Sequence, residues 1–281
     1  MNSSVTKTFE LMERLRDSGE DFCVATVVRT AAATSAKAGA KAIVTRDGEV
    51  HGFIGGGCVQ GAVRRVGMQA VADGQPRMIR VKPKEDVVEP VDIDGVELHK
   101  SSCPSGGSVD IFFEPMRQAA RLVVCGASPV AVTLIKLAGT MGYQIIAAAL
   151  AEDHDKIAGA DQALAGFDLS GLALSERDAV VIATQGKRDR EALTQALVSG
   201  AGYAGMVGSR RKIATLLDQL GSDVPAAAKA ALHGPAGLDI GAIEPEEIAL
   251  SIIGEIVMER RRAMQKGGVE SADAAPDTEA V

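Results

Sequence analysis

The residues best suited to chemistry near the start of the chain are three glycines followed by a cysteine, Ile54-Gly55-Gly56-Gly57-Cys58. Glycine permits tight turns and lets backbone N–H groups approach a ligand closely. The apolar segment that follows predicts a helix, whose first N–H groups lack partners and attract anions or a thiolate. The run therefore predicts an anion cradle at Gly55, Gly56 and Gly57 beside a reactive thiol. The alternative is a simple corner with Cys58 as a small buried residue.

A second cysteine, Cys103, lies in the run Ser101-Ser-Cys-Pro-Ser-Gly106-Gly107 between two predicted strands. The run again joins a thiol to glycines that expose backbone donors. Two thiolates that converge would suit a soft ion such as Cu(I) or a molybdenum centre. They could equally form a disulfide or be unrelated. Cys23 and Cys125 lie inside apolar segments and are predicted to be core residues.

In the second half, Gly126-Ala-Ser128-Pro-Val-Ala131 follows an apolar strand and opens a helix, as a G-x-G-x-x-G/A dinucleotide motif does. Ser128 occupies the second glycine position, where a side chain hinders the approach of a pyrophosphate. Glu152 or Asp153 is available as the acidic residue of such a site. The motif predicts a Rossmann scaffold that binds NAD(P) or another nucleotide, or one that serves only for docking.

Three later loops carry further candidate binding residues. Gln185 and Ser209-Arg210 follow predicted parallel strands, at whose carboxyl ends such sheets bind ligands. Ser209 can cap a helix, and the basic residues beside that helix start favour an anionic ligand or an acidic partner, unless they form a solvated turn. Asp239 could orient His233 in a glycine-rich loop, although such a pair is more often structural.

The elements that position the first two runs form a mixed unit. Apolar spacing predicts a helix over 6–17, a strand over 22–28, a hairpin of strands 41–45 and 50–54, and a helix over 58–72. Further short strands are expected near 78–81, 96–99 and 109–114. This order of elements indicates an α+β domain.

From about residue 118 the pattern changes to alternating strands and helices, which predicts a parallel sheet covered on both faces. The strands are expected at 122–125, 144–150, 179–184 and 203–208, and the helices at 130–141, 190–199, 210–220 and 245–263. The predicted class is therefore α/β, with an N-terminal α+β domain (1–117), a Rossmann-like domain (118–266) and a disordered tail (267–281).

Composition excludes several classes of function. The 281 residues are 46% hydrophobic with a formal net charge of −7, which argues against a nucleic acid partner. The cysteines show neither a disulfide framework nor a zinc-finger spacing. The polar N-terminus lacks a signal-peptide core, and no uninterrupted apolar run is long enough for a membrane span. A cytoplasmic protein is expected.

In this order, five segments resemble the XdhC/CoxI family of accessory proteins for xanthine dehydrogenase and aerobic carbon monoxide dehydrogenase. They are GFIGGGCVQGAV, the run CPSGGSVDIFFEP, VVCGASPVA, YAGMVGSRRK and GLDIGAIEPEEIALSIIGEIV. The resemblance implies an N-terminal XdhC-type domain, a Rossmann domain, and binding of molybdenum cofactor of the molybdopterin type. It also implies assistance in sulfuration, handover to an apo molybdenum hydroxylase, contact with other maturation proteins, and a homodimer.

On that resemblance, Cys58 and Cys103 are the residues expected to contact the cofactor or a metal. Thr184-Gln-Gly-Lys and Ser128-Pro differ from the T-x-D-H and Gly-His patterns frequent in the family, and residues 29–39 lack its Gly-Ser-x-Pro pattern. The first two departures resemble the CoxI/CoxF branch. They favour a maturation chaperone for a carbon monoxide dehydrogenase, acting through cofactor, sulfur or copper. The alternatives are an NAD(P)-dependent oxidoreductase and a docking scaffold without a cofactor.

Overall fold

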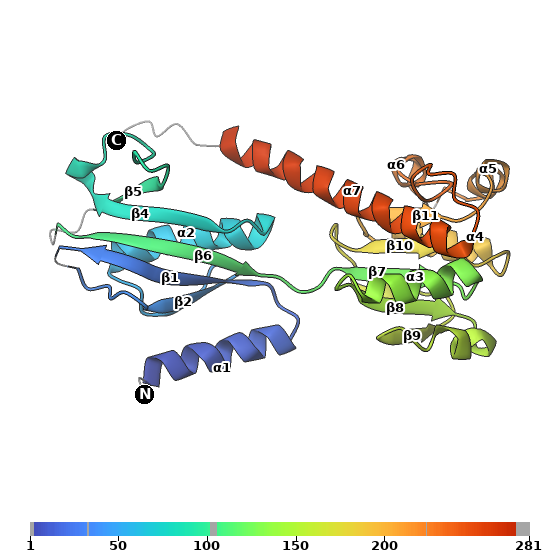
Figure 1. Cartoon of the computed structure of the whole chain (residues 1–281), viewed down its shortest axis with the longest axis horizontal. Helices are drawn as coiled ribbons and strands as arrows, with labels where there is room; N and C mark the ends of the chain where they lie inside the picture. Colours follow the sequence, from blue (N-terminus) through green and yellow to red (C-terminus); the bar gives the residue numbers. More distant parts are fainter. Residues whose placement is uncertain (1–2, 33, 102–105, 223, 274–281) are drawn as a thin grey trace. The chain divides into compact units, whose positions relative to one another are not determined.

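The computed structural model describes residues 3–32, 34–101, 106–222 and 224–273, and the chain divides into two compact units (Figure 1). Unit 1 comprises Met1–Gln118 and unit 2 comprises Ala119–Val281. Each unit has its own sheet and its own hydrophobic clusters. The α/β class with a parallel-sheet second half is confirmed.

Unit 1 contains a six-stranded sheet in the order β3-β2-β1-β6-β4-β5. Its strands are β1 (Phe22–Ala31), β2 (Lys41–Thr45), β3 (Val50–Gly52), β4 (Arg77–Pro83), β5 (Glu97–Ser101) and β6 (Ser108–Met116). All pairs are antiparallel except β4 with β5.

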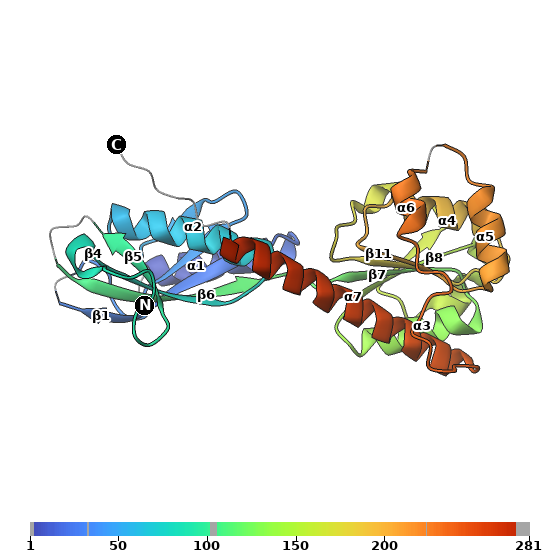
Figure 2. The same ribbon diagram turned by 90° about the horizontal axis from the view of Figure 1, so that it is seen from above.

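Two helices cover unit 1's sheet, because its strands alternate apolar side chains between the two faces. Cys23, Ala25 and Val27 of β1 pack in one cluster with α2 (Gly57–Asp73), which Figure 2 shows lying along the sheet. Phe22 and Val24 belong to a second cluster with α1 (Ser3–Asp17). The long strand β1 thus joins both cores of unit 1.

Unit 2 contains a five-stranded parallel sheet in the order β11-β10-β7-β8-β9. Its strands are β7 (Arg121–Cys125), β8 (Gln144–Ala149), β9 (Gln162–Ala165), β10 (Ala179–Ile182) and β11 (Tyr203–Met206). Sequence analysis did not predict β9, whose four residues are polar or small and largely exposed, so no apolar run marks them.

Helices lie on both faces of unit 2's sheet, as the near-continuous apolar strands require. One hydrophobic cluster contains α3 (Pro129–Gly139) and α7 (Pro245–Asp273), and the other contains α4 (Asp189–Val198) and α5 (Arg210–Asp218). The short α6 (Ala226–Ala230) was not predicted. Helix α7 continues to Asp273, into the segment 267–281 for which a disordered tail was predicted; residues 274–281 lie outside the described residues. None of the described helices is long and apolar enough to cross a bilayer.

Candidate functional site

The glycine run of unit 1 connects β3 to α2, and its glycines do different work. Gly55 has a φ of +139°, and a Cβ there would lie 3.1 Å from the side chain of Val59, so its glycine serves packing. A Cβ on Gly56 would come no closer than 3.9 Å to Ser35 Oγ, and one on Gly57 would meet nothing within 4 Å. The surface at Gly56 and Gly57 is therefore open enough for a ligand to approach the backbone.

Helix α2 begins at this open surface without a side-chain cap. Gly56 is its N-cap residue and makes no side-chain cap hydrogen bond. The N–H groups of the first helical turn have no acceptor within the helix, and they carry the positive end of the helix dipole. The predicted anion cradle is thus available at Gly56 and Gly57, whereas Gly55 is buried.

Cys58 is the second residue of α2 and is exposed. The alternative that Cys58 is a small buried core residue is therefore wrong. Cys23 and Cys125 are fully buried, as predicted, and burial raises the pKa of each thiol to about 12. Among the described cysteines, Cys58 is the one placed to react with a solute.

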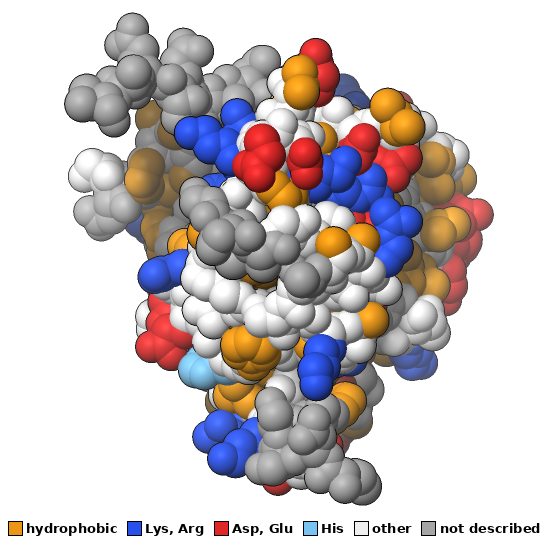
Figure 3. All heavy atoms as spheres, turned by 90° about the vertical axis from the view of Figure 1, so that its left-hand side faces the viewer, with side chains coloured by type: hydrophobic (Ala, Val, Ile, Leu, Met, Phe, Trp, Pro, Cys, Tyr) orange, Lys and Arg blue, Asp and Glu red, His pale blue; other side chains and the backbone are white. Residues whose placement is uncertain are grey.

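Sheet topology brings this loop to one edge of unit 1. Ala31 at the end of β1 pairs with Ser108 at the start of β6, and Pro83 at the end of β4 pairs with Ser101 at the end of β5. We call this the glycine edge; its described residues are 32, 34–40, 53–58, 101 and 106–108. Figure 3, which views unit 1 from its end, shows a broad white area of backbone and uncharged polar side chains, with most charged side chains gathered around it.

A contact between α2 and β5 indicates which side of the helix Cys58 occupies. Arg65 lies seven residues after Cys58, two turns along the same side of α2. Its Nη2 donates to His99 Nδ1 of β5 at 2.8 Å. The end of α2 lies beside Arg117, which follows β6, so α2 runs antiparallel to β4 and β5. Cys58 is thus on the side of α2 that faces the end of β5.

The second predicted thiol, Cys103, lies outside the described residues, as do its neighbours 102–105. The residues that flank this segment, Ser101 and Gly106, both belong to the glycine edge. Gly106 is exposed with a φ of +65°, and Gly107 is half-buried. Convergence of the two cysteines stays a prediction.

Sequence analysis missed a buried histidine beside this edge. His99 is 8% exposed, and because an arginine can only donate, the Arg65 contact requires an unprotonated Nδ1. Its Nε2 then carries the proton and lies 2.7 Å from Glu97 Oε1, and this histidine holds the pKa of Glu97 below its usual value. Residues i and i+2 share a face of a strand, so the Glu97-Leu-His99 spacing was the available signal.

In unit 2, the predicted dinucleotide loop is only partly what the sequence indicated. Ser128 caps α3, since its Oγ accepts a hydrogen bond from the Ala131 N–H at 3.2 Å. Gly126 has a φ of +117°, and a Cβ there would lie 2.5 Å from the Ala183 carbonyl oxygen. Gly126 is therefore needed for packing between β7 and β10, which its predicted role as a cofactor contact does not explain.

Charged side chains gather at the carboxyl edge of unit 2's sheet. Asp153, which follows β8, is bound by Lys156 Nζ and by Lys187 Nζ, each at 2.6 Å. Asp189, at the start of α4, accepts from the Thr184 hydroxyl and pairs with Lys212 Nζ at 2.5 Å. The pKa of Asp153 is held below its usual value by Lys156 and then Lys187. Of these residues, the sequence had indicated Asp153 as an acid and the loops of Lys187 and Lys212.

The other predicted residues of this edge are placed as follows. Gln185 is exposed with a φ of +53° in the loop between β10 and α4. Ser209 caps α5 by accepting from the Lys212 N–H at 3.3 Å, and Arg210 is exposed at the first position of that helix.

Asp239 is not the partner of His233. His233 Nδ1 lies 3.2 Å from Glu255 Oε1, and Glu255 Oε2 accepts from the Tyr203 hydroxyl at 2.6 Å and from the Gly237 N–H at 2.8 Å. Asp239 itself is exposed. The glutamate of α7 was missed because it lies more than twenty residues from the histidine in sequence, where no local spacing can indicate it.

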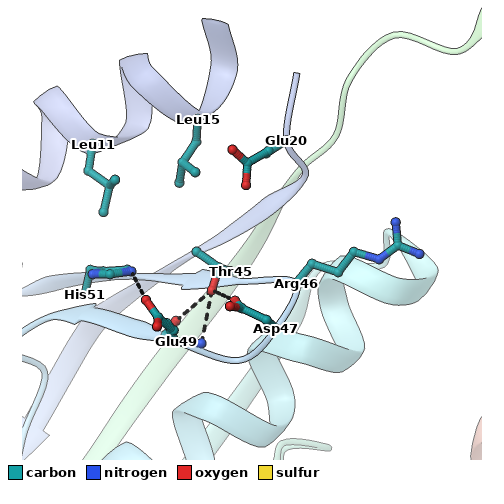
Figure 4. A pocket seen from close by; sticks show the side chains of 8 residues that line it. All are labelled: Leu11, Leu15, Glu20, Thr45, Arg46, Asp47, Glu49 and His51. Carbon is teal, nitrogen blue, oxygen red and sulfur yellow. Dashed lines mark hydrogen bonds and ion pairs between the residues drawn. The ribbon is translucent and has the colours of Figure 1, made fainter. Parts of the chain in front are cut away.

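A groove of about 520 Å³ in unit 1 lies apart from both edges, between α1 and the turn from β2 to β3 (Figure 4). Leu11 and Leu15 form its apolar wall. Its carboxylates are held locally, since Asp47 bonds to Thr45 and Glu49 lies 3.2 Å from His51. Among the described residues of the chain, no group of three His, Cys, Asp or Glu side chains could hold a metal ion.

Comparisons with known proteins agree with this division. Residues 15–82 match the model described as the XdhC and CoxI family, and residues 122–256 match the XdhC Rossmann domain. The chain is 29% identical over 258 residues to an uncharacterized protein, YqeB, of Escherichia coli strain K12, which covers 89% of this chain and 46% of that one. It is 30% identical over 162 residues to a probable subunit of xanthine dehydrogenase from Bacillus subtilis strain 168, covering 55% and 47%.

The chain therefore spans about half the length of these two curated relatives. A solved structure described as a xanthine dehydrogenase from Bacillus halodurans is also similar, with a TM-score of 0.44 and 18% identity. The similarity covers 91% of this chain and 96% of that one.

Proposed function

Because the chain belongs to the XdhC and CoxI family, we propose that it is a maturation factor that prepares the molybdenum centre of a hydroxylase. The observation that carries the proposal is the exposed thiol of Cys58 beside the open backbone of Gly56 and Gly57. One relative, described as a probable subunit of xanthine dehydrogenase, supports a client of the molybdenum hydroxylase class.

The glycine edge fits a cofactor of the molybdopterin type. Such a cofactor carries a phosphate, which the uncapped N–H groups at the start of α2 could bind as an anion. It also carries soft sulfur and molybdenum, for which a thiolate is the matching protein ligand. When bound, the cofactor would supply the redox-active molybdenum centre that the client needs. The chain's own residues would bind it, with Gly56 and Gly57 on the phosphate and Cys58 toward the metal end.

Copper fits the described residues less well, because they provide a single exposed thiol at this edge. A two-thiol site would require Cys103, so copper or sulfur transfer through Cys58 and Cys103 is the finer form of the proposal. Carbon monoxide dehydrogenase is the finer form of the client, on the strength of the Ser128-Pro and Thr184-Gln-Gly-Lys departures. A homodimer and contact with other maturation proteins belong to the same proposal.

The test is to purify the full chain anaerobically from a cofactor-producing host and measure bound pterin and copper. We expect pterin in the wild type, and its loss in Cys58→Ala and Cys103→Ala. The matched control is Gln60→Ala, an exposed change two residues further along α2. Wild-type protein without pterin would contradict the proposal.

A second readout identifies the client. Apo xanthine dehydrogenase and apo carbon monoxide dehydrogenase are each incubated with the loaded chain, and the recovered activity is measured. Activation of the second enzyme alone supports the finer proposal. Substrate turnover by the chain itself with NAD(P)H would instead support the oxidoreductase alternative.

A further inference from the structure

The ion pair between Asp153 and Lys187 crosses the crevice of unit 2's sheet. Asp153 follows β8 and Lys187 follows β10, and β7 lies between these two strands. Their side chains nevertheless meet at 2.6 Å. The chain order reverses between β7 and β10, the point at which open parallel sheets bind ligands. The pair therefore spans the end of β7, where the loop from Gly126 to Ser128 begins.

The two lysines on Asp153 keep most of their hydrogen-bonding capacity. The Asp153 side chain is 7% exposed, whereas those of Lys156 and Lys187 are 58% and 51% exposed. An ammonium group has three N–H donors, and each lysine uses one on Asp153. Two half-exposed cations on one buried carboxylate leave a net positive site at the mouth of the crevice. Its donors suit a phosphate group.

The loop that carries Lys187 is held in a strained conformation. Gln185 and Arg188, on either side of it, have φ values of +53° and +55°, which are unfavourable for residues with a side chain. The Asp189 carboxylate fixes the loop by accepting from the Thr184 hydroxyl and from the Gly186 N–H at 3.1 Å. Strain that is maintained by such contacts is typical of functional sites. Here its effect is to hold Lys187 toward the crevice.

We propose that unit 2 binds the phosphate groups of a nucleotide in this crevice, and that they bind by taking Lys187 and Lys156 from Asp153. In the absence of the nucleotide, the carboxylate occupies the two ammonium groups and acts as a latch. Binding then costs the free energy of breaking the Asp153 ion pairs, which lowers the apparent affinity. This proposal is independent of the maturation function, because no step in it uses Cys58.

The latch predicts opposite effects for its two sides. Lys187→Met removes a charged donor and should weaken nucleotide binding about tenfold. Asp153→Asn removes the competing charge and should strengthen binding, by about fivefold. Lys136→Met, an exposed lysine in the last turn of α3, is the matched control and should leave the affinity unchanged. Cys58→Ala should also bind nucleotide as the wild type does.

The experiment is titration calorimetry of the full chain with NADPH, NADH, ATP and inorganic pyrophosphate. We expect at least one nucleotide to bind more tightly than pyrophosphate, with an affinity that falls as salt is added. Equal binding of pyrophosphate and nucleotides would overturn the nucleotide assignment. Weaker binding by Asp153→Asn would overturn the latch, since it would make Asp153 a ligand contact. Absence of binding in both the wild type and Asp153→Asn would overturn the whole proposal, and Lys187→Met keeps the test valid should Asp153→Asn fold poorly.

Discussion

The chain contains two glycine loops with the same sequence context, and the structure uses them differently. Each follows an apolar strand, opens a helix and stands next to a cysteine: Gly55–Cys58 in unit 1 and Cys125–Ser128 in unit 2. At Gly57 a side chain would meet nothing within 4 Å, whereas at Gly126 it would lie 2.5 Å from the Ala183 carbonyl oxygen. One loop leaves space for a ligand and the other fills that space with a neighbouring strand.

The difference shows that glycine spacing identifies a sharp turn but not the reason for it. In unit 1 the open backbone and the exposed thiol of Cys58 supply soft, uncharged chemistry. In unit 2 the thiol of Cys125 is buried, and the lysines and aspartates of the carboxyl edge supply charge instead. The two edges are therefore suited to different parts of a ligand, or to different ligands.

The largest difference between the loops should be in thiol reactivity. Cys58 is exposed, whereas Cys125 is fully buried and burial raises its pKa to about 12, so little thiolate is accessible there. We expect a disulfide reagent at pH 8 to modify Cys58 at least roughly 1,000-fold faster than Cys125. The measurement is a labelling time course in a Cys103→Ser background, with sites identified by peptide mass. Comparable rates at the two cysteines would remove the contrast.

The next largest effect should come from adding a methyl group to each loop. Gly126→Ala faces both a φ of +117° and a backbone clash, so we expect it to lower the free energy of unfolding by about 3 kcal/mol or more. Gly57→Ala meets open space and should change that free energy by less than about 0.5 kcal/mol. Urea denaturation of both variants measures the difference. Equal stability would mean that unit 2's loop is as open as that of unit 1.

These contrasts mark where sequence reasoning was sufficient. The strand β2, the buried Cys23 and Cys125, and the change from an α+β to a parallel pattern follow from local apolar periodicity. Gly126 was assigned to a ligand because the sequence cannot show that Ala183, fifty-seven residues away, would occupy the space of its side chain. The Asp153–Lys187 pair likewise depends on strand order, which places β7 between the strands that precede these residues.

The same limit explains the charged cluster that sequence reasoning missed in unit 1. Arg80 of β4 is 8% exposed and binds Asp110 Oδ1 at 2.7 Å, Asp92 at 2.7 Å and Asp94 at 3.0 Å. Alternation along β4 predicts only that Arg80 and Lys82 share a face. Their partners come from β6 and from the loop before β5, so the cluster emerges only from the pairing of strands.

Arg80 allows a test of whether unit 1 uses its charges for stability and unit 2 uses them for binding. Arg80→Met leaves the buried Asp110 without its main partner and should lower the free energy of unfolding by about 3 kcal/mol. Lys187→Met removes a half-exposed lysine and should cost less than about 1 kcal/mol. Arg29→Met, which removes a largely exposed partner of Asp110, controls for loss of charge alone. Similar losses in Arg80→Met and Lys187→Met, measured in urea, would contradict the distinction.

The smallest effects should separate the packed side of α2 from its open side. Gly67 lies against β2, where an added Cβ would be 2.6 Å from Val44 Cγ2, and Gly67→Ala should destabilise unit 1 by about 1–3 kcal/mol. Gly61 is exposed, and a Cβ there meets nothing within 4 Å. Gly61→Ala should stabilise unit 1 by about 0.5–1 kcal/mol, because alanine favours the helix.

Both alanine variants are measured by thermal and urea unfolding, and Gly61→Ala is also assayed for bound pterin. Gly61 lies three residues after Cys58, about one helical turn along α2. A stabilised Gly61→Ala variant that has lost pterin would extend the ligand surface from the glycine loop along this side of the helix. A stabilised variant that retains pterin would confine that surface to Gly56, Gly57 and Cys58. Destabilisation by Gly61→Ala would contradict the open surface itself, since it would require a neighbour that packs against this side of α2.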